Sequence, residues 1–228
     1  MRVAVTGAAG LIGGVVYDTL VAEGHEVIGI DRPHEDWMEA AGRNTEDATA
    51  PSRVTHHFDL AEASDSDWQM MLDDCEVVVH LAADANPSNS DESMLRNNIL
   101  VSTNFMRNAQ IAGVRRVVLS SSGLTQVGLE IELLPGGSLD GQLIGVSHGT
   151  STTSTYGESK VFVERLGQYY SKGHGVECIV VRIGTVIPNE SEHWERGGRL
   201  QATAFLQADV SNFFSAAVGA DFSSWDPQ

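Results

Sequence analysis

The start of the chain constrains its fold more than any other stretch. An apolar run that ends at Val5 is followed by Gly7, Gly10 and Gly13, which recur every third residue as a helical pattern begins. This order predicts a strand, a phosphate-binding turn and a helix. Gly7 permits an unusual φ, Gly10 permits close approach of a pyrophosphate, and Gly13 permits close packing of helix on strand. The helix N-terminus offers free N–H groups and a positive dipole end to the phosphates.

A second apolar strand, residues 26–30, leads into Asp31. An acid at this place accepts hydrogen bonds from a ribose 2′-hydroxyl, which favours NAD over NADP. Arg32 follows directly and can pair with a 2′-phosphate, so NADP stays open as a second cofactor. The spacing is G-x-x-G-x-x-G instead of the G-x-G-x-x-G fingerprint, and a glycine-rich turn without ligand is the alternative interpretation.

Composition indicates a globular chain with a full core. A length of 228 residues with 42% hydrophobic content suits one domain, or one domain with a small appendage. No stretch of about 18 apolar residues and no signal-peptide order is present, so a soluble, cytoplasmic protein without a membrane partner is expected. Cys75 and Cys178 lack a C-x-x-C spacing, which predicts free, packed thiols and no disulfide framework. No metal site is predicted.

The charge balance excludes one class of partner. A net charge of −17, from 31 acidic and 14 basic residues, argues against nucleic-acid binding, which needs cationic side chains to neutralise phosphates. Lys160 and Lys172 are the only lysines. Such an acidic, lysine-poor composition indicates adaptation to high salt, where a Debye length of about 3 Å screens the self-repulsion. An acidic protein without that adaptation is the alternative, since acidity alone serves solubility.

Strand and helix patterns alternate along the chain. Strands are expected at residues 3–5, 26–30, 53–58, 76–81, 114–119 and 177–183. Helices are expected after Gly10 and at residues 64–72, 92–112, 155–172 (with Gly173 as C-cap) and 208–218. This alternation predicts an α/β fold with a Rossmann-type, doubly wound parallel sheet and right-handed crossovers. Residues 32–51 form a surface excursion in this interpretation, and residues 123–153 form a lid over an active site or a disordered loop.

Polar residues at the strand ends have two interpretations each. Asp59 follows the third strand and can contact an adenine amino group or cap the next helix. His80 ends a buried strand and is interpreted as a hydrogen-bonded core histidine in preference to a base or ligand. Arg196 and Arg199 flank two glycines and can bind a carboxylate or phosphate, or lie in a solvated loop.

Three residues form a candidate catalytic set. Ser122 follows the fifth strand, Tyr156 opens the next helix, and Lys160 lies four residues later on the same helical face. A neighbouring ammonium favours the phenolate and moves the tyrosine pKa from about 10 toward working pH. This set suits proton abstraction from an alcohol while hydride leaves the same carbon for a nicotinamide. A chance Tyr–Lys pair on a helix is the alternative.

A series of motifs in chain order carries a family resemblance. The motifs are T-G-A-A-G-L-I-G at 6–13, Asp31, D-L at 59–60, H-L-A-A at 80–83, S-S-S at 120–122, Y-G-E-S-K at 156–160 and V-R-I-G at 181–184. Together they resemble the extended short-chain dehydrogenase/reductase superfamily, in its NAD-dependent epimerase/dehydratase branch, over residues 1–218. The resemblance implies Ser122, Tyr156 and Lys160 as catalytic residues. The cofactor contacts that it implies are Gly7, Gly10, Leu11, Ile12, Gly13, Asp31, Asp59, Leu60, Ala82, Tyr156 and Lys160.

Within that branch the chain is most similar to uronate dehydrogenases and to NAD-dependent hexose or hexose-phosphate dehydrogenases. This similarity implies that Ser122, Thr185 and Arg196 contact the sugar. The uronate enzymes carry Asn-His after the catalytic serine, whereas this chain has Gly123-Leu124. The loop at 123–153 is longer than in that group, and the final strand and helices of the group are missing. We therefore expect a cofactor domain at 1–184 and a small, incomplete substrate-binding part at 185–228.

The predicted function is NAD-dependent oxidation of a sugar hydroxyl, at the anomeric carbon of an aldose, uronate or sugar phosphate, to a lactone. A nucleotide-sugar 4-epimerase or dehydratase uses the same residues and is the first alternative. A dinucleotide-sensing protein without catalysis is the second. The long helices at 92–112 and 155–172 predict a homodimer through a four-helix interface, as the family often shows.

Overall fold

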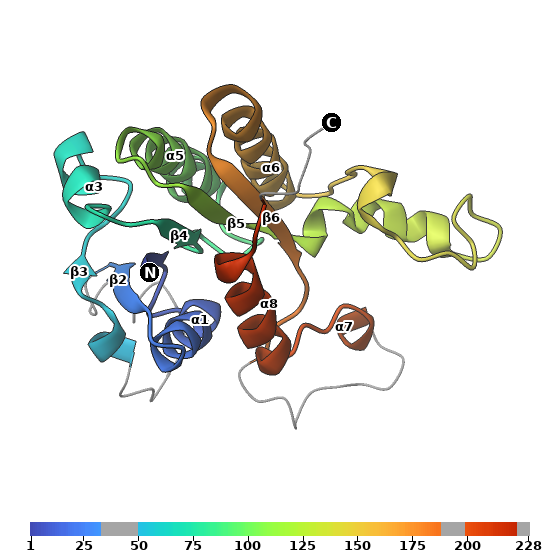
Figure 1. The fold of residues 1–228 in the computed structure, drawn as a ribbon. Coiled ribbons are helices and arrows are strands. Elements are labelled where there is room, and N and C mark those ends of the chain that lie inside the picture. The colour runs from blue at the N-terminus through green and yellow to red at the C-terminus, as the bar shows by residue number, and fades with distance from the viewer. Residues whose placement is uncertain (33–49, 188–198, 223–228) are drawn as a thin grey trace.

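The computed structural model describes residues 1–32, 50–187 and 199–222. Its centre is a six-stranded sheet in which neighbouring strands run parallel, in the order β3-β2-β1-β4-β5-β6 (Figure 1). The strands are β1 (Arg2–Thr6), β2 (Glu26–Asp31), β3 (His56–His57), β4 (Val77–His80), β5 (Arg116–Ser122) and β6 (Glu177–Ile183). The predicted Rossmann-type sheet is confirmed. Its strand order reverses between β1 and β4, and sheets of this kind bind their ligands at the carboxyl ends of the strands at such a point.

The third strand is shorter than the sequence predicts. Strand β3 contains two residues of the expected 53–58, and a 3-10 turn, η1 (Ala50–Arg53), precedes it. Two further backbone bonds flank the strand, from the Thr55 N–H to the Gly29 carbonyl at 2.8 Å and from the Phe58 N–H to the Asp31 carbonyl at 2.8 Å. Pro51 at the start has a fixed φ and no N–H, which favours a turn over a ladder.

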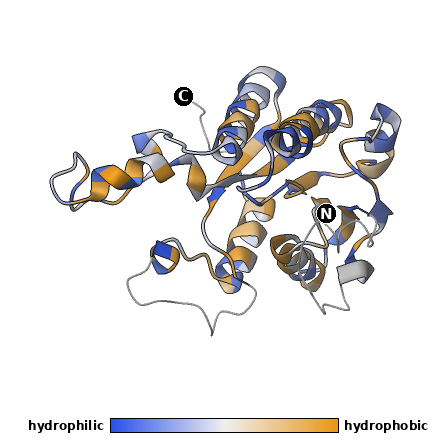
Figure 2. Cartoon of the chain, turned by 180° about the vertical axis from the view of Figure 1, so that it is seen from behind, coloured by the Kyte–Doolittle hydropathy of each residue, from blue (hydrophilic) through white to orange (hydrophobic). Residues whose placement is uncertain are grey.

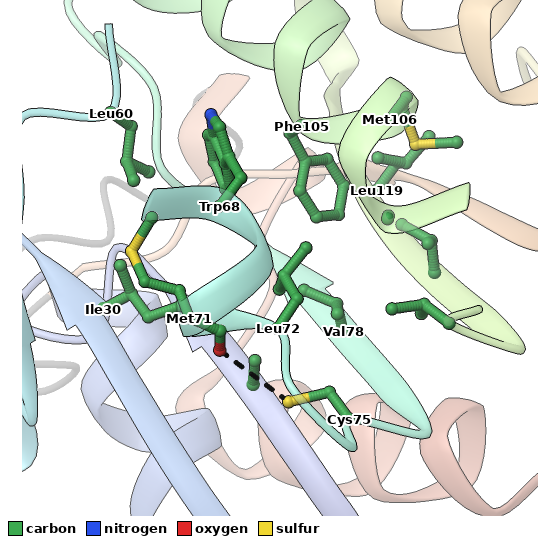
Figure 3. Packing of buried hydrophobic residues seen from close by; sticks show 14 of the residues in the cluster. Ile30, Leu60, Trp68, Met71, Leu72, Cys75, Val78, Phe105, Met106 and Leu119 are labelled. Atoms are coloured by element: carbon green, nitrogen blue, oxygen red, sulfur yellow. Dashed lines mark hydrogen bonds between the residues drawn. The ribbon is translucent and has the colours of Figure 1, made fainter. Parts of the chain in front are cut away.

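Helices cover both faces of the sheet and bury two apolar clusters. Helices α1 (Leu11–Ala22) and α8 (Gln207–Gly219) cover one face, where Val16, Leu20 and Phe214 are buried. The other face is covered by α3 (Asp65–Met71), α5 (Val101–Ile111) and α6 (Thr155–His174). Figure 3 shows this second cluster, in which Trp68 and Phe105 lie with ring centroids 5.7 Å apart. Removing these aromatic and aliphatic surfaces from water is the main force that holds the layers together.

The predicted helix at 92–112 consists of three parts. It begins as α4 (Asp91–Met94), continues as a π-helical segment, η2 (Leu95–Leu100), and ends as α5. The amide of Asn98, inside the π-helical segment, is bonded to the backbone of Asp84 after β4. A uniform apolar stripe gives no warning of such a bulge, which often marks a functional site.

The remaining helix ends differ in detail from the prediction. Ser64 caps α3 in a reciprocal capping box with Asp67, so the alternative in which Asp59 caps this helix is wrong. Helix α6 continues past Gly173 and ends at Gly175, whose φ of 71° is left-handed. The predicted helix at 208–218 is confirmed as α8.

The long segment after β5 is built from short 3-10 helices. These are η3 (Gly123–Thr125), η4 (Val127–Leu133) and η5 (Val146–His148). The segment projects from the body of the molecule in Figure 1, and Figure 2 shows that it mixes apolar and polar residues. The two ends of the segment are bonded to each other, since the Gly128 N–H donates to the Ser151 carbonyl and the Ser151 N–H donates to the Thr125 carbonyl. The segment is therefore ordered at its base, and the disordered alternative is not what the structure shows.

A buried arginine fastens the last described helix to the sheet. Arg116 is the first residue of β5. Its Nη1 donates to the carbonyls of Ala217 (3.2 Å) and Val218 (2.8 Å), at the C-terminal end of α8. Its Nη2 donates to the Ala220 carbonyl at 2.5 Å, and its Nε donates to Glu177 at 2.9 Å. A cation at this end of a helix also interacts favourably with the helix dipole.

Two further expectations concern the whole chain. Cys75 and Cys178 are both free thiols, as predicted, and burial raises their pKa values to about 11 and about 12. Among the described residues, no helix has the length and apolar character needed to cross a bilayer. The division at residue 184 stays a prediction, although α8 packs on α1 and on the same sheet as the N-terminal residues.

Candidate active site

The glycine turn has the backbone geometry expected of a phosphate cradle. Gly7 has a φ of 74°, and a Cβ there would lie 2.9 Å from the Ala82 nitrogen. A Cβ on Gly13 would lie 1.9 Å from the Gly7 carbonyl oxygen, so only glycine allows α1 to pack this closely. Gly10 begins α1 without a side-chain cap, and Leu11 and Ile12 open its first turn. The turn therefore presents uncapped N–H groups to an anion.

Asp31 lies against this turn at the end of β2. Its Oδ2 accepts the Ala9 N–H at 2.9 Å and its Oδ1 accepts the Arg32 N–H at 2.8 Å. Burial raises the pKa of the Asp31 carboxyl above its ordinary value, and the two N–H donors offset only part of that shift. The carboxylate is thus fixed in orientation where the sequence predicts a ribose contact.

The other predicted cofactor contacts follow β3 and β4. Asp59 accepts a hydrogen bond from Arg96 at 3.0 Å; burial raises its pKa, but this bond and the other donors bring the net value below the ordinary range. The Leu60 side chain is buried in the core near Trp68 (Figure 3). The Ala82 N–H donates to the Thr6 hydroxyl at 3.1 Å, beside the glycine turn.

Ser122 and Tyr156 come together at the carboxyl end of β5. Tyr156 lies in the first turn of α6, whose N-cap Ser154 accepts the Gly157 N–H at 3.1 Å. The Ser122 hydroxyl accepts the Leu124 N–H at 3.1 Å, and Ser122 lies near enough to the Tyr156 phenol to oppose part of the rise in its pKa. Both side chains are buried. A serine and a phenol that lie next to each other can hold one substrate hydroxyl between them.

Lys160 completes the set but does not act on the tyrosine as the sequence predicts. Its Nζ lies 5.8 Å from the centroid of the Tyr156 ring and donates to the Ser120 carbonyl at 3.1 Å. Burial lowers the pKa of Lys160 to about 8. Burial also raises the pKa of Tyr156 above 10, and the hydrogen bond from Ser122 only partly opposes this. The net shift of the Tyr156 pKa is therefore opposite to the expected lowering, and Lys160 is not among the groups that act on it.

Asn98 is a site residue that the sequence analysis missed. Its side-chain N–H group donates to the Ser159 hydroxyl at 3.0 Å and to the Asp84 carbonyl at 3.1 Å. Ser159 in turn donates to the Tyr156 carbonyl at 2.7 Å. Asn98 thus joins the π-helical segment, the loop after β4 and the first turn of α6. The only sequence signal is an Asn-Asn pair inside an apolar stripe.

A half-buried ion pair supports the site from the side of β6. Arg182 donates from Nε and Nη2 to Glu164 at 2.7 and 2.8 Å, and the Ser121 hydroxyl donates to the same carboxylate at 2.6 Å. The pKa of Glu164 is raised by burial, yet these donors hold it below its ordinary value. Arg182 also reaches the Gly149 carbonyl at 3.4 Å, which ties the loop after β5 to β6.

The predicted sugar contacts are only partly described. Thr185 follows β6, and its hydroxyl lies 2.9 Å from the hydroxyl of Thr203. Arg196 lies outside the described residues. Arg199, at the start of α7 (Arg199–Ala202), is bound by both oxygens of Glu130 in η4, at 2.7 to 3.0 Å. Neither the solvated loop nor a free anion site describes Arg199, because a carboxylate of the chain itself occupies it.

His80 is the core residue that the sequence favours. Its Nδ1 lies 2.9 Å from the Thr6 hydroxyl, and its ring stacks on Phe105 with centroids 4.1 Å apart. Burial lowers its pKa to about 3, so it stays neutral. A base or ligand role has no support from these contacts.

The arrangement joins a glycine turn at the β1–α1 corner with a serine, a tyrosine and a lysine beyond β5. Residues 3–210 match the NAD dependent epimerase/dehydratase family. The chain belongs to this family. The match covers both the turn and the catalytic set, so the resemblance stated from the motifs is confirmed.

Relatives within the family include sugar dehydrogenases and sugar-nucleotide epimerases. The chain is 32% identical over 192 residues to the L-arabinose 1-dehydrogenase (NAD(P)(+)) of Haloferax volcanii, covering 82% of this chain and 67% of that one. It is 34% identical over 128 residues to the UDP-glucose 4-epimerase of Mycolicibacterium smegmatis, covering 54% and 39%. A crystal structure of the uronate dehydrogenase from Agrobacterium tumefaciens complexed with NAD matches with a TM-score of 0.72 and 26% identity, over 96% of this chain and 72% of that one.

Proposed function

We propose that the chain oxidises a sugar hydroxyl with NAD, at the anomeric carbon, and releases a lactone. The observation that carries the proposal is the placement of Ser122 beside Tyr156, one helical turn from Lys160, at the same edge of the sheet as the glycine turn. Related dehydrogenases named for arabinose and uronate support a sugar as the substrate. The chain spans about two thirds of the first of these relatives and less of the epimerase, so the activity is a proposal.

The residues of the turn fit a dinucleotide. The backbone at Gly7 and Gly13 leaves no room for a Cβ, α1 begins without a side-chain cap, and Asp31 is fixed at the end of β2. The turn and the first turn of α1 would hold the pyrophosphate, and Asp31 would hold the adenosine ribose. When bound, NAD supplies the hydride acceptor.

Tyr156 would act as the base that takes the proton of the sugar hydroxyl. Ser122 orients that hydroxyl by hydrogen bonding, and Lys160 supplies a positive charge one turn away. Because burial raises the pKa of Tyr156, the free chain holds a protonated phenol at neutral pH. We therefore expect oxidation to be faster at alkaline pH, where the phenol loses its proton more readily.

The test is the substitution Tyr156→Phe. It removes the phenol oxygen and keeps the ring, so we expect NAD affinity to change less than about twofold and turnover to fall by roughly 10³-fold or more. Turnover is measured from NADH absorbance with aldoses, uronates and sugar phosphates, and NAD affinity by calorimetry. Retained turnover in the variant would remove Tyr156 from the mechanism.

A 4-epimerase or dehydratase remains the second candidate, because the epimerase from Mycolicibacterium smegmatis is 34% identical over 128 residues. Such an enzyme returns its hydride to the substrate. Net NADH accumulation with free sugars distinguishes oxidation from epimerisation. A binding protein without catalysis would bind NAD and turn over none of the sugars.

We also propose a homodimer through α5, η2 and α6. Leu95, Leu100, Ile111 and Tyr169 on these helices are between 44% and 59% exposed, which is the kind of apolar surface that a partner subunit covers. Light scattering in low and molar salt measures the assembly. The same pair of conditions tests the proposed salt adaptation, which rests on the charge of −17.

A further inference from the structure

In the ion pair between Glu130 and Arg199, two nitrogens of the guanidinium bind the carboxylate. Nε donates to both carboxylate oxygens, at 3.0 and 2.8 Å, and Nη2 donates to Oε1 at 2.7 Å. The two side chains are 35% and 43% exposed, so the pair is reachable from solvent. A bidentate guanidinium–carboxylate contact has the geometry with which arginine recognises an acidic ligand.

Both partners are anchored on the substrate side of the sheet. Glu130 lies in η4, eight residues beyond Ser122, and the base of η4 is fixed by the Gly128 N–H, which donates to the Ser151 carbonyl at 2.8 Å. Arg199 lies one turn before Thr203, whose carbonyl accepts the Thr185 N–H at 2.7 Å.

The two anchors are neighbours because β5 and β6 are paired. Ser122 lies opposite Ile183 in the register, and Thr185 follows two residues later. Figure 1 shows η4 and α7 at this same edge of the molecule. The pair thus bridges the segment after Ser122 and the segment after β6.

Other cations of this region are also engaged. Lys160 donates to the Ser120 carbonyl, and Arg182 is paired with Glu164. The Asp84 carboxylate acts on Tyr156 as an unfavourable charge. Among the described residues around the site, an acidic sugar therefore meets cations that already have partners, together with the negative charge of Asp84.

We propose that Glu130 determines which substrates the site accepts according to their charge. By occupying Arg199, it makes the site select uncharged aldoses over uronates and sugar phosphates. This rests on the proposed sugar dehydrogenase function and adds the class of sugar. An acidic sugar must replace one carboxylate on Arg199 by another and leave Glu130 unpaired beside itself. An uncharged sugar leaves the pair intact. Discrimination by a repulsive group is a common route to specificity.

The test uses Glu130→Gln in the full chain, with Glu132→Gln as the matched control. Glu132 lies in the same 3-10 helix and accepts from Ser138, so its substitution removes one negative charge without freeing Arg199. The measured quantity is the ratio of kcat/KM for glucuronate to that for glucose, at constant ionic strength. We expect a ratio below one in the unaltered chain, a rise of about tenfold in Glu130→Gln, and a change below about twofold in Glu132→Gln.

A second readout separates this proposal from the proposed function. The thermal midpoint is measured with glucuronate and with glucose, without NAD. Glucuronate should stabilise Glu130→Gln more than the unaltered chain or Glu132→Gln, and adding Arg199→Gln should abolish the difference. This result supports the proposal even if no sugar is oxidised, which would count against the dehydrogenase function alone. Equal responses of the two glutamine variants, or a preference of the unaltered chain for glucuronate, would overturn it.

Discussion

The two halves of the candidate site are built in different ways. On the nucleotide side, the β1–α1 turn and Asp31 are positioned by backbone geometry, because Gly7 and Gly13 leave no room for a side chain. On the substrate side, η4 and α7 are joined by one ion pair between exposed side chains. A backbone cradle fits any dinucleotide and tolerates little change. An ion pair between exposed side chains contributes little to stability, so either residue can be substituted with a small loss. This suits the part of an enzyme that chooses among sugars.

The largest expected effect is on the nucleotide side, for Gly13→Ala. The new Cβ would lie 1.9 Å from the Gly7 carbonyl oxygen, so α1 must move away from the turn. We expect a loss of about 3 kcal/mol or more in the free energy of unfolding, with loss of NAD binding. Urea unfolding and calorimetry measure the two effects.

Gly14→Ala is the control for that substitution. Its Cβ would meet only the end of the flexible Arg53 side chain, at 3.0 Å, and alanine favours a helix interior. A change within about 1 kcal/mol is expected. If both alanine variants lost the same stability and NAD affinity, close packing of α1 on the glycine turn would not explain the effect of Gly13→Ala.

The next effect lies between the two halves, at Lys160. Burial lowers its pKa from 10.5 to about 8, so between pH 8 and pH 10.5 the folded chain holds fewer protons at this group than the unfolded chain does. Stability should rise with pH through this window and level off above it. The net cost of the buried charge below pH 8 is about 3 kcal/mol.

Lys160→Met removes this titration. Relative to the variant, the unaltered chain should gain stability as the pH rises from 8 to 10.5, in unfolding experiments without NAD. A difference that is independent of pH would mean that Lys160 keeps an ordinary pKa. The variant should also be inactive, as expected for a functional residue held at a cost in stability.

The smallest expected effect concerns Arg32. Its Nη2 donates to the Asn97 side-chain carbonyl at 2.8 Å, beside Asp31, where a 2′-phosphate would lie. We expect Arg32→Gln to lower kcat/KM for NADP by about threefold to tenfold and to change that for NAD by less than about twofold. Arg107→Gln is the control, because Arg107 pairs with Asp65 at the surface of α5. Equal losses with both cofactors would give Arg32 a structural role.

The difference between the halves also explains what the sequence could predict. The glycine turn, Asp31 and the Tyr156–Lys160 spacing are local patterns, and the structure places them as predicted. Asn98 could not be recognised, because its partners Ser159 and Asp84 lie 61 and 14 residues away. A contact between distant segments leaves no periodic signal.

The pKa shift of Tyr156 and the ion-pair partner of Arg199 also could not be predicted from the sequence. The pattern predicts that Lys160 lowers the pKa of Tyr156, but burial of Tyr156 raises it, and burial depends on the finished fold. The partner of Arg199 is Glu130, which lies 69 residues away in a segment with no strong pattern. The 3-10 helices there repeat neither the α-helical nor the strand period.

The contacts of Arg116 have a consequence for how the chain is made. The guanidinium is fully buried, yet three of its acceptors are carbonyls 101 to 104 residues further along the chain. A nascent chain that has completed β5 holds a charge that cannot be desolvated without cost until α8 arrives. We therefore expect docking of α8 to be a late folding step. Until then the face of the sheet that α8 covers stays open, and this apolar surface is available to molecular chaperones.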